Sequence, residues 1–409
     1  METPYYDSIV VGCGGIGSGA LYWLARQAGK GVLGLEQFKL GHENGGSQDH
    51  SRVIRMDYVD GEYIDLCRGA YSCWEEVERE SGHRLIHKTG GVSFTEGSPT
   101  AEGYIAKFEE AMNKHGVSYE RLDGDLLKKR YPQFTTTSDC QAIFIPDNGV
   151  LDAALANATN IQLARKHGAT ILEEVKVTGI TKYRGLPLVQ TNRGNFRSRR
   201  VVVTAGAWAN DVLQSVGVNV PLRVTQEQVT YFATPHLQDF TKDRFPCWTF
   251  FSPEGEVYYG LPIHGAAGPK IGIDAAGDVV TAHTRSFVPN QKNIEKCIKM
   301  CQTYLPGYLG PILKTKTCLY AMTLDRHFVI DTCHRTGFPE VIVCYGAGHA
   351  FKFASVLGKI LAELVIDGWT SFDIKSFSLD RPAVTDPDFQ PAIEIGKWRE
   401  LAQLGISKL

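Results

Sequence analysis

The sequence predicts a mixed α/β fold of two domains, one built on a parallel sheet and one on a mainly antiparallel sheet. Apolar residues 8–11, helix-forming residues 20–28 and apolar residues 31–35 follow one another as strand, helix and strand. Residues 199–208 carry three successive valines and end in small residues, which is typical of a buried parallel strand. Between residues 221 and 262 the pattern changes to alternation, which indicates antiparallel strands. A chain of 409 residues also exceeds the usual size of one hydrophobic core.

The first strand runs directly into a turn with the spacing Gly-x-Gly-x-x-Gly. Gly12 permits the tight turn, Gly14 lets the backbone approach a pyrophosphate, and Gly17 lets the helix pack closely on the strand. The helix that follows directs its N–H groups and its positive dipole end at the phosphates. Glu36 closes the second strand, where a carboxylate accepts hydrogen bonds from the adenosine ribose. The turn predicts a dinucleotide site, and the Glu36 carboxylate disfavours the 2′-phosphate of NADP. The turn does not by itself separate FAD from NAD.

The composition excludes several classes of partner. Lys and Arg number 43 against 45 Asp and Glu, so no basic surface for nucleic acid is expected. No apolar run is long enough to span a bilayer, and no signal region precedes the first strand. The ten cysteines are scattered, which favours free thiols in a reducing compartment. His83 and His87 have no third ligand nearby in sequence, so no metal site is expected.

The dinucleotide domain is expected to be discontinuous. We assign residues 1–90, 151–220 and 318–380 to it, residues 91–150 and 221–317 to a substrate-binding domain, and residues 381–409 to a tail. Helices are expected over residues 63–81, 103–114, 151–167 and 351–366, and a strand over residues 170–180.

The chain ends in Ser407-Lys408-Leu409, a tripeptide that the peroxisomal import receptor reads. The signal works if the tail is exposed, and the polar, proline-containing residues 382–388 are consistent with a detached tail. The sequence therefore predicts a peroxisomal location, with the import receptor as a partner.

A second glycine turn lies late in the chain, in residues 345–352, and again follows an apolar strand and precedes a helix. Its helix start would direct N–H groups and a positive dipole at an electron-rich group. A reduced flavin ring is such a group.

Residues 318–331 and 348–352, together with residues 47–55, resemble the amine-oxidising flavoenzymes formed by sarcosine oxidase, pipecolate oxidase and the amadoriases. The family pattern Cys-x-Tyr-x-x-Thr-x-Asp-x-x-Phe-x-Ile-Asp begins here at Cys318, and Ser-x-x-x-Ser/Thr-Arg-x-Ile-Arg ends at Arg55. The resemblance runs from residue 9 to about residue 377, and the combination of motifs is highly specific. It implies a glutathione-reductase-like Rossmann domain that binds FAD, a substrate domain above the flavin, a covalent bond from Cys318 to the flavin, and a monomer.

The same resemblance assigns roles to single residues. Arg52 would lie over the flavin face, and Arg55 and Lys352 would hold the substrate carboxylate. Lys270 would hold a water near flavin N5 and supply positive charge where oxygen gains electrons. The catalytic residues implied are Arg52, Tyr259, Lys270, Asp274 and Tyr320. The residues expected to contact the cofactor are Gly12, Gly14, Gly15, Ile16, Gly17, Glu36, Gln37, Ser47, Arg52, Val175, Lys176, Val177, Ala205, Gly206, Trp208, Cys318, Gly346, Gly348, His349, Phe351 and Lys352.

Taken singly, these residues have simpler interpretations. Arg55 is typical of an edge strand, Lys270 of a solvated loop, and Cys318 of an ordinary buried thiol. Trp208 and Tyr320 are typical of core aromatics. Only the agreement of all the positions favours the functional interpretation.

Three positions depart from the family pattern. Ala350 replaces the second glycine of Gly-His-Gly-Phe-Lys and adds a methyl group where backbone should approach the flavin. Asp274 stands where sarcosine oxidases usually carry a pocket histidine, and Gln48 where histidine is frequent. An acid in the pocket would repel a carboxylate and favour a cationic or hydrogen-bond-donating group. The substrate is therefore left open.

The resemblance implies an oxidase of secondary amino acids, N-methylated, N-alkylated or cyclic, such as sarcosine or L-pipecolate. Hydride would leave the carbon next to nitrogen for the flavin, giving an imine, and oxygen would be reduced to hydrogen peroxide. Arg52, Arg55 and Lys352 would lower the pKa of the bound amine by like-charge repulsion. The alternatives are a dehydrogenase with another electron acceptor, a flavin-binding scaffold without activity, and an oxidase of larger adducts such as saccharopine or fructosyl amino acids.

Overall fold

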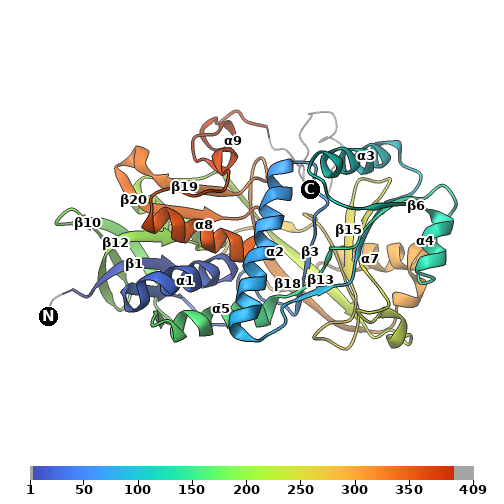
Figure 1. The fold of residues 1–409 in the computed structure, drawn as a ribbon, viewed down its shortest axis with the longest axis horizontal. Coiled ribbons are helices and arrows are strands. Elements are labelled where there is room, and N and C mark those ends of the chain that lie inside the picture. Colours follow the sequence, from blue (N-terminus) through green and yellow to red (C-terminus); the bar gives the residue numbers. More distant parts are fainter. Residues whose placement is uncertain (1–2, 391–409) are drawn as a thin grey trace.

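Two large sheets lie side by side in the computed structural model, which describes residues 3–390, and helix α2 (Gly61–Ser81) runs between them (Figure 1). One sheet has a parallel centre and the other is mainly antiparallel. The fold class predicted from the sequence is therefore confirmed.

The first sheet carries the glycine turn at the end of its central strand. Its parallel strands lie in the order β9-β2-β1-β12-β20, and antiparallel strands complete it on the β12 side. Because the parallel strands share one direction, their carboxyl ends meet at one edge, where ligands of such sheets bind. Its strands are β1 (Tyr5–Val11), β2 (Val32–Leu35), β9 (Thr170–Leu172), β10 (Val177–Tyr183), β11 (Leu186–Thr191), β12 (Gly194–Val203), β19 (Val329–Cys333) and β20 (Phe338–Tyr345).

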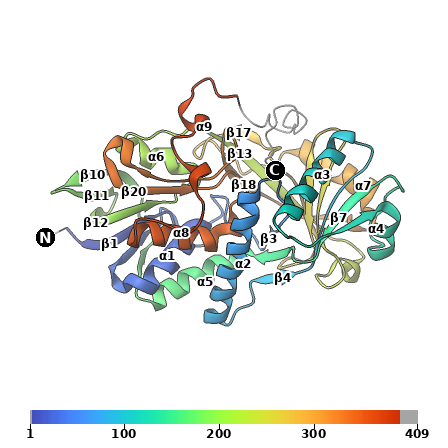
Figure 2. The ribbon, with the colours of Figure 1, turned by 45° about the horizontal axis from the view of Figure 1, so that its top comes forward.

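Helices cover both faces of this sheet, which explains why residues 8–11, 32–35 and 201–203 of its parallel strands are all buried. Val10 packs with α1 (Gly15–Ala28), α5 (Ala153–Lys166) and α8 (Ala354–Ile366). Ile9 and Val11 point to the other face and pack with α6 (Ala209–Leu213). Figure 2 shows α1, α5 and α8 together on one side and α6 on the other.

The second sheet forms the other half of the molecule. Its strands run β17-β13-β16-β15-β14-β5-β7-β6, and β18 pairs with β13 along eleven residue pairs. All neighbours are antiparallel except β5 and β14. Its strands are β5 (Gly91–Thr95), β6 (Glu120–Asp123), β7 (Gln141–Ile145), β13 (Leu222–Phe232), β14 (Cys247–Phe251), β15 (Val257–Leu261), β16 (Lys270–Ile273), β17 (Asp278–Val280) and β18 (Ile312–Thr323). The remaining helices are α3 (Pro99–Lys114), α4 (Gly124–Arg130), α7 (Gln291–Tyr304) and α9 (Pro382–Thr385).

A small third sheet of β3 (Ser51–Ile54), β4 (Ile86–Lys88) and β8 (Gly149–Asp152) accompanies the two large ones. The domain boundary placed at residue 318 falls inside β18, so residues 318–323 continue the antiparallel sheet. Cys318 therefore reaches the cofactor side from the other half of the molecule.

The single strand expected over residues 170–180 is wrong. β9 ends at Leu172, the backbone of Glu174 takes a φ of 57°, and β10 starts at Val177 at the far edge of the sheet. The intervening segment crosses the end of β2, where the Val175 N–H donates to the Glu36 carbonyl at 2.8 Å. This crossing brings residues 175–177 to the edge where the glycine turn lies.

Some expectations concern features outside the fold itself. The tripeptide Ser407-Lys408-Leu409 lies outside the described residues. Within the described range, no helix has the length and apolar character needed to cross a membrane, and no group of three or more His, Cys, Asp or Glu side chains is arranged to hold a metal ion. All ten cysteines are described as free thiols.

Candidate active site

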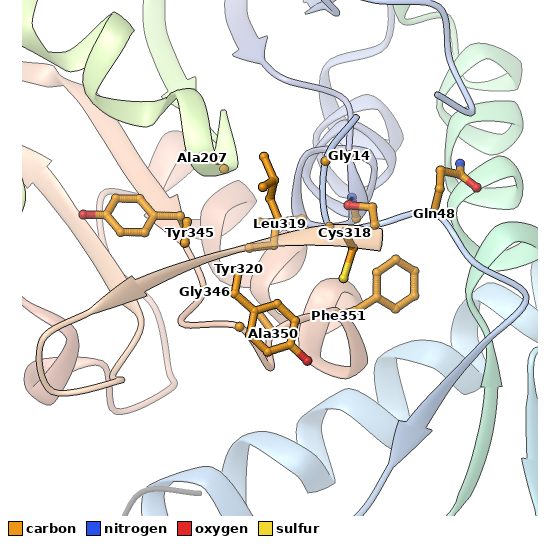
Figure 3. Close-up of a pocket in the computed structure, with 18 of the residues that line it drawn as sticks. Gly14, Gln48, Ala207, Cys318, Leu319, Tyr320, Tyr345, Gly346, Ala350 and Phe351 are labelled. Atoms are coloured by element: carbon orange, nitrogen blue, oxygen red, sulfur yellow. Dashed lines mark hydrogen bonds between the residues drawn. The ribbon is translucent and has the colours of Figure 1, made fainter. Parts of the chain in front are cut away.

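One pocket lies where the carboxyl ends of the parallel strands face the second sheet. Nearly all the site residues predicted from the sequence line this pocket. Of the cofactor-contacting residues named above, only Gly17 is absent from its wall. The wall also contains Arg55, Tyr259, Lys270, Asp274 and Tyr320. Figure 3 shows the two glycine turns, at Gly14 and Gly346, on either side of strand β18.

The first glycine turn is closed to any side chain. Gly12 has a φ of 91°, which favours glycine, and its N–H donates to the Leu35 carbonyl at 2.8 Å. A Cβ atom on Gly17 would lie 1.8 Å from the Gly12 carbonyl oxygen. Gly17 does not line the pocket but lets helix α1 pack closely against the turn. The backbone of the turn itself forms the pocket surface.

Glu36 is fixed at the end of β2 with its carboxylate ionised. It is 4% exposed and accepts hydrogen bonds from the N–H groups of Cys13 at 2.9 Å and Phe38 at 3.0 Å. Burial raises the pKa of Glu36, but the contact with His42 and these two backbone donors outweigh it and lower the pKa overall. A buried carboxylate in the wall beside the turn is the arrangement that a ribose requires.

The side chain of Ser47 and the Phe351 ring of the late glycine turn both lie close to Gly15 of the first glycine turn. The Gly15 N–H donates to Ser47 Oγ at 2.8 Å, and a Cβ atom on Gly15 would lie 2.8 Å from the Phe351 ring. Backbone thus forms a cradle that side chains would fill, with the buried carboxylate at one end. These residues fit the dinucleotide FAD.

Cys318 lies on β18 with its sulfur turned into the pocket. Figure 3 shows the sulfur directed toward the Phe351 ring, on the same side of the strand as Tyr320, whereas Leu319 points to the opposite side. Of the ten cysteines, all of which are described, Cys318 alone is partly exposed and the others are buried. Burial raises the pKa of Cys318 to about 11, although Arg52 opposes this shift. The side chain is therefore a neutral thiol at physiological pH.

Lys270 lies in the pocket wall in an ion pair that sequence reasoning missed. Its Nζ atom lies 2.9 Å from Asp49 Oδ2 and donates to the Ser51 carbonyl at 2.6 Å. Arg52 Nη1 lies 3.3 Å from the same Asp49 oxygen. Burial lowers the pKa of Lys270 to about 8, with Asp49 opposing and Arg52 adding to the effect. Burial also disfavours ionisation of Asp49, yet Lys270 and Arg52 hold its pKa well below the ordinary value.

Arg55 likewise has an acidic partner, the buried residue Asp57. Its Nη1 atom lies 3.0 Å from Asp57 Oδ2, and the Asp57 carboxylate also accepts from Ser93 and Asn148, each at 2.7 Å. Asp57 is 1% exposed, so the pair is held rigidly beneath the pocket.

Lys352 is different, because within residues 3–390 it has no carboxylate partner. Its Nζ atom donates to the Tyr58 hydroxyl and to the His349 carbonyl, each at 2.9 Å. An ammonium group has three donors, so one remains for a ligand. The Trp74 Nε1–H of α2 donates to the Lys352 carbonyl at 2.8 Å and anchors its backbone. Burial, followed by repulsion from Arg55, lowers the pKa of Lys352 to about 7.

Asp274, which was expected to repel a substrate carboxylate, is paired with an arginine. Arg326, in the turn after β18, donates to its two carboxylate oxygens at 2.6 and 3.3 Å. The expected repulsion of a substrate carboxylate by Asp274 is therefore largely cancelled. Arg326 has a φ of 57° and is 3% exposed. Three cations were expected to lower the pKa of a bound amine by repulsion. This effect is reduced in the same way, because Arg52 and Arg55 also face acids.

The methyl group of Ala350 is accommodated inside the late glycine turn. A Cβ atom on Gly346 would lie 1.9 Å from the Ala350 Cβ atom, so the two positions share one space. Alanine is tolerated at 350 because residue 346 is glycine. Gln48, the third departure, also lines the pocket.

A further buried acid faces Cys318 across the sheet. Glu227 on β13 is the direct cross-strand partner of Cys318, and it is 3% exposed. Its carboxylate accepts from the Thr225 hydroxyl at 2.5 Å and from the N–H groups of Ala276 and Gly277 at 3.1 and 3.0 Å. Burial raises the pKa of Glu227 to about 7.

The charged residues that sequence reasoning missed differ in how they could have been found. Asp49 precedes Arg52 by three residues and Asp57 follows Arg55 by two, so their proximity along the chain was a usable signal. Arg326 and Glu227 gave no such signal, since Asp274 and Cys318, which they face, are distant in sequence.

Comparison with known proteins identifies the family of the chain. Residues 7–364 match the family model described as FAD dependent oxidoreductase. Monomeric sarcosine oxidase of Bacillus sp. (strain B-0618) is 31% identical over 94% of this chain and 98% of that protein. N-methyl-L-tryptophan oxidase of Yersinia pestis (strain Pestoides F) is 30% identical over 92% and 99%.

Solved structures of known proteins share this fold. NikD, an unusual amino acid oxidase essential for nikkomycin biosynthesis, superimposes with a TM-score of 0.81 at 26% identity, over 96% of this chain and 99% of that one. L-proline dehydrogenase from P. horikoshii shares the fold, with a TM-score of 0.79 at 21% identity, over 92% and 97%. With the glycine cradle, the buried ribose-side carboxylate and these matches together, the chain belongs to the family of FAD-dependent amine and amino acid oxidases that contains monomeric sarcosine oxidase.

Proposed function

We propose that the protein oxidises a secondary amino acid, N-alkylated or cyclic, at the carbon–nitrogen bond and passes the electrons to O₂. One observation carries this proposal most directly. Lys352, a buried cation with a free donor, lies in the same pocket wall as the FAD cradle and Cys318. Sarcosine, N-methylated amino acids and L-pipecolate are the candidates that the relatives' names and the motif resemblance support.

FAD, when bound, supplies the two-electron acceptor for the carbon–nitrogen bond and the route by which those electrons reach O₂. The backbone of residues 12–16, Glu36 and Ser47 would hold its dinucleotide part. Residues 346–351 would hold the ring end. We further propose that Cys318 is the point of covalent attachment, because its sulfur is turned into the pocket.

The carboxylate of the substrate would bind at Lys352. The ammonium group offers its third donor, and Tyr58 and His349 hold it in place. Arg55 lies beside the same Tyr58 ring, with its guanidinium carbon 4.6 Å from the ring centre, so it adds positive potential without giving up Asp57. This arrangement would fix the carboxylate end of the ligand in the pocket whose wall also contains Tyr259 and Tyr320.

The same cations act on the substrate nitrogen. Only a neutral amine gives up hydride readily, and a protonated amine near Lys352 is disfavoured by like-charge repulsion. The effect rests mainly on Lys352, because Arg52 and Arg55 are paired with acids. Lys270 supplies the fixed positive charge where O₂ takes up electrons.

An anaerobic titration tests the proposal. Purified enzyme is mixed with sarcosine, L-pipecolate, L-proline, N-methyl-L-tryptophan, saccharopine and a fructosyl amino acid, and loss of the yellow colour is followed. We expect bleaching by at least one secondary amino acid, followed in air by one equivalent of hydrogen peroxide. Bleaching without peroxide indicates a dehydrogenase, and no bleaching by any of the six refutes the proposed substrate class.

Lys270→Met separates the two half-reactions. Methionine keeps an unbranched side chain of nearly the same length and removes the charge, so reoxidation by O₂ should slow by orders of magnitude while anaerobic bleaching is spared. Equal slowing of both steps would contradict the role given to Lys270.

We also propose a peroxisomal location, supported by Ser407-Lys408-Leu409 alone. A fluorescent protein placed before residue 1 should enter peroxisomes with the 409-residue chain. It should stay outside them when the last three residues are removed.

A further inference from the structure

Asp49 has no role in the motif that contains it, yet it makes the densest set of polar contacts in the pocket wall. Its Oδ2 atom faces both Lys270 Nζ at 2.9 Å and Arg52 Nη1 at 3.3 Å. Its Oδ1 atom accepts a hydrogen bond from the Tyr231 hydroxyl at 2.7 Å. The side chains of Asp49 and Lys270 are 3% and 2% exposed. One buried carboxylate therefore serves two cations.

The surroundings of Lys270 show what this carboxylate does. Arg52 faces Lys270 from the same segment as Asp49 and repels its charge. The centre of the Tyr231 ring on β13 lies 5.8 Å from Lys270 Nζ. Cys318 on β18 and Cys247 on β14 are close enough to interact electrostatically with Lys270. In the described part of the chain, Asp49 is the one ionised acid in an ion pair with Lys270.

Removing Lys270 from water disfavours its charged form, and a second cation nearby disfavours it further. A carboxylate at hydrogen-bond distance is the ordinary compensation. Without it, Lys270 would face Arg52 with only the Ser51 carbonyl as a polar partner.

We propose that Asp49 is the positioning residue of the oxygen half-reaction, which keeps Lys270 protonated and fixes its ammonium group in the pocket wall. Asp49 acts through Lys270. The carboxylate also holds Arg52, so the two cations together contribute one net positive charge to the pocket. The catalytic part of this inference rests on the proposed oxidase function, whereas the titration of Lys270 does not.

The first test measures the proton affinity of Lys270 directly. Holoenzyme is treated with cyanate, which carbamylates only the neutral amine, and the rate at Lys270 is read by peptide mass spectrometry from pH 6 to 10. The wild type should titrate near pH 8. Asp49→Asn should lower this midpoint by about 1 to 3 pH units, the usual effect of a nearby opposite charge. At pH 7.5 the protonated fraction would then fall from about three quarters to about one quarter or less.

Two variants serve as controls. Asp49→Glu keeps the charge and should restore a midpoint close to that of the wild type. Tyr231→Phe removes one hydrogen bond to Asp49 but leaves the ion pair, so it should shift the midpoint far less than Asp49→Asn. If Asp49→Asn does not fold, Asp49→Glu and the wild type still decide: a wild-type midpoint below pH 6.5 would show that Lys270 is not kept protonated.

The second test asks whether Asp49 acts through Lys270. Reoxidation by O₂ is measured for Asp49→Asn, Lys270→Met and the double variant. We expect Asp49→Asn to slow reoxidation at least threefold at pH 7.5, in line with the protonated fraction, and to add nothing in the Lys270→Met background. An unchanged Lys270 midpoint, or additive effects of the two substitutions, overturns the inference. If no substrate reduces the enzyme, the proposed function fails while the cyanate result still judges Asp49.

Discussion

The lowered pKa of Lys352 predicts how ligand binding depends on pH. Lys352 titrates at about 7 in the free protein, so it is charged below that pH and neutral above it. A carboxylate ligand needs the charged form. A ligand without an amine, such as propionate, isolates this effect because it does not titrate in the range.

The magnitude follows from the titration. If only protonated Lys352 binds, the apparent Kd of propionate is flat below pH 6 and rises about tenfold per pH unit above 7. Between pH 7 and pH 9 it should rise about 50-fold. Propionamide, which is neutral, should show no such rise.

The variant Lys352→Arg supplies a matched control. Arginine stays protonated over this range, so the contribution of residue 352 to the pH dependence should vanish. Lys270, which titrates at about 8, could leave at most about a tenfold rise. Kd is measured from the change in the visible flavin spectrum on titration with propionate. An equal pH dependence in the wild type and in Lys352→Arg would refute the assignment of Lys352 as the carboxylate anchor.

Three further predictions concern the cofactor site and the sheet beside it. Gly17→Ala places a Cβ atom against the Gly12 carbonyl, so the free energy of unfolding should fall by about 1–3 kcal/mol and the FAD content of the purified protein should fall with it. The control Gly103→Ala, at an exposed helical position, should stabilise the protein slightly. Equal effects of the two substitutions would contradict the packing argument. Glu227→Gln should raise the free energy of unfolding more at pH 8 than at pH 5. The pKa of Glu227 is raised in the folded protein, so the wild type loses up to about 3 kcal/mol of folding stability as the pH rises from 4.5 through 7. A difference in Tm between variant and wild type that is constant with pH would show that folding does not raise the pKa of Glu227. Acid precipitation should leave the wild-type pellet yellow and the Cys318→Ala pellet colourless, and colour in the supernatant of both would refute covalent attachment.

The sequence predicted the part of the fold that local patterns determine. The glycine turn, helix α1 and strands β1 and β2 follow from the spacing of glycines and apolar residues within forty residues. Figure 1 shows the consequence, a parallel sheet with helices packed on it, beside a second sheet. The alternation in residues 224–232 likewise gave strand β13.

Long-range partners could not be predicted in this way. Asp49 and Lys270 are 221 positions apart, and their contact depends on how β3 meets β16. The same holds for the pairing of Asp274 with Arg326, which largely cancels the repulsion of a carboxylate that was expected from Asp274. The break after Leu172 was missed because it comes from a turn at Glu174 that no proline or glycine marks.

The short 3-10 turn Phe351–Phe353 joins two binding functions in adjacent residues. Phe351 touches the first glycine turn, and Lys352 presents its ammonium group to the ligand. Any shift of this turn on loading the nucleotide therefore alters the affinity for carboxylates. Thermodynamic reciprocity then requires that a carboxylate change the affinity for the nucleotide by the same factor and in the same direction. Where that change is favourable, saturation with either ligand strengthens binding of the other.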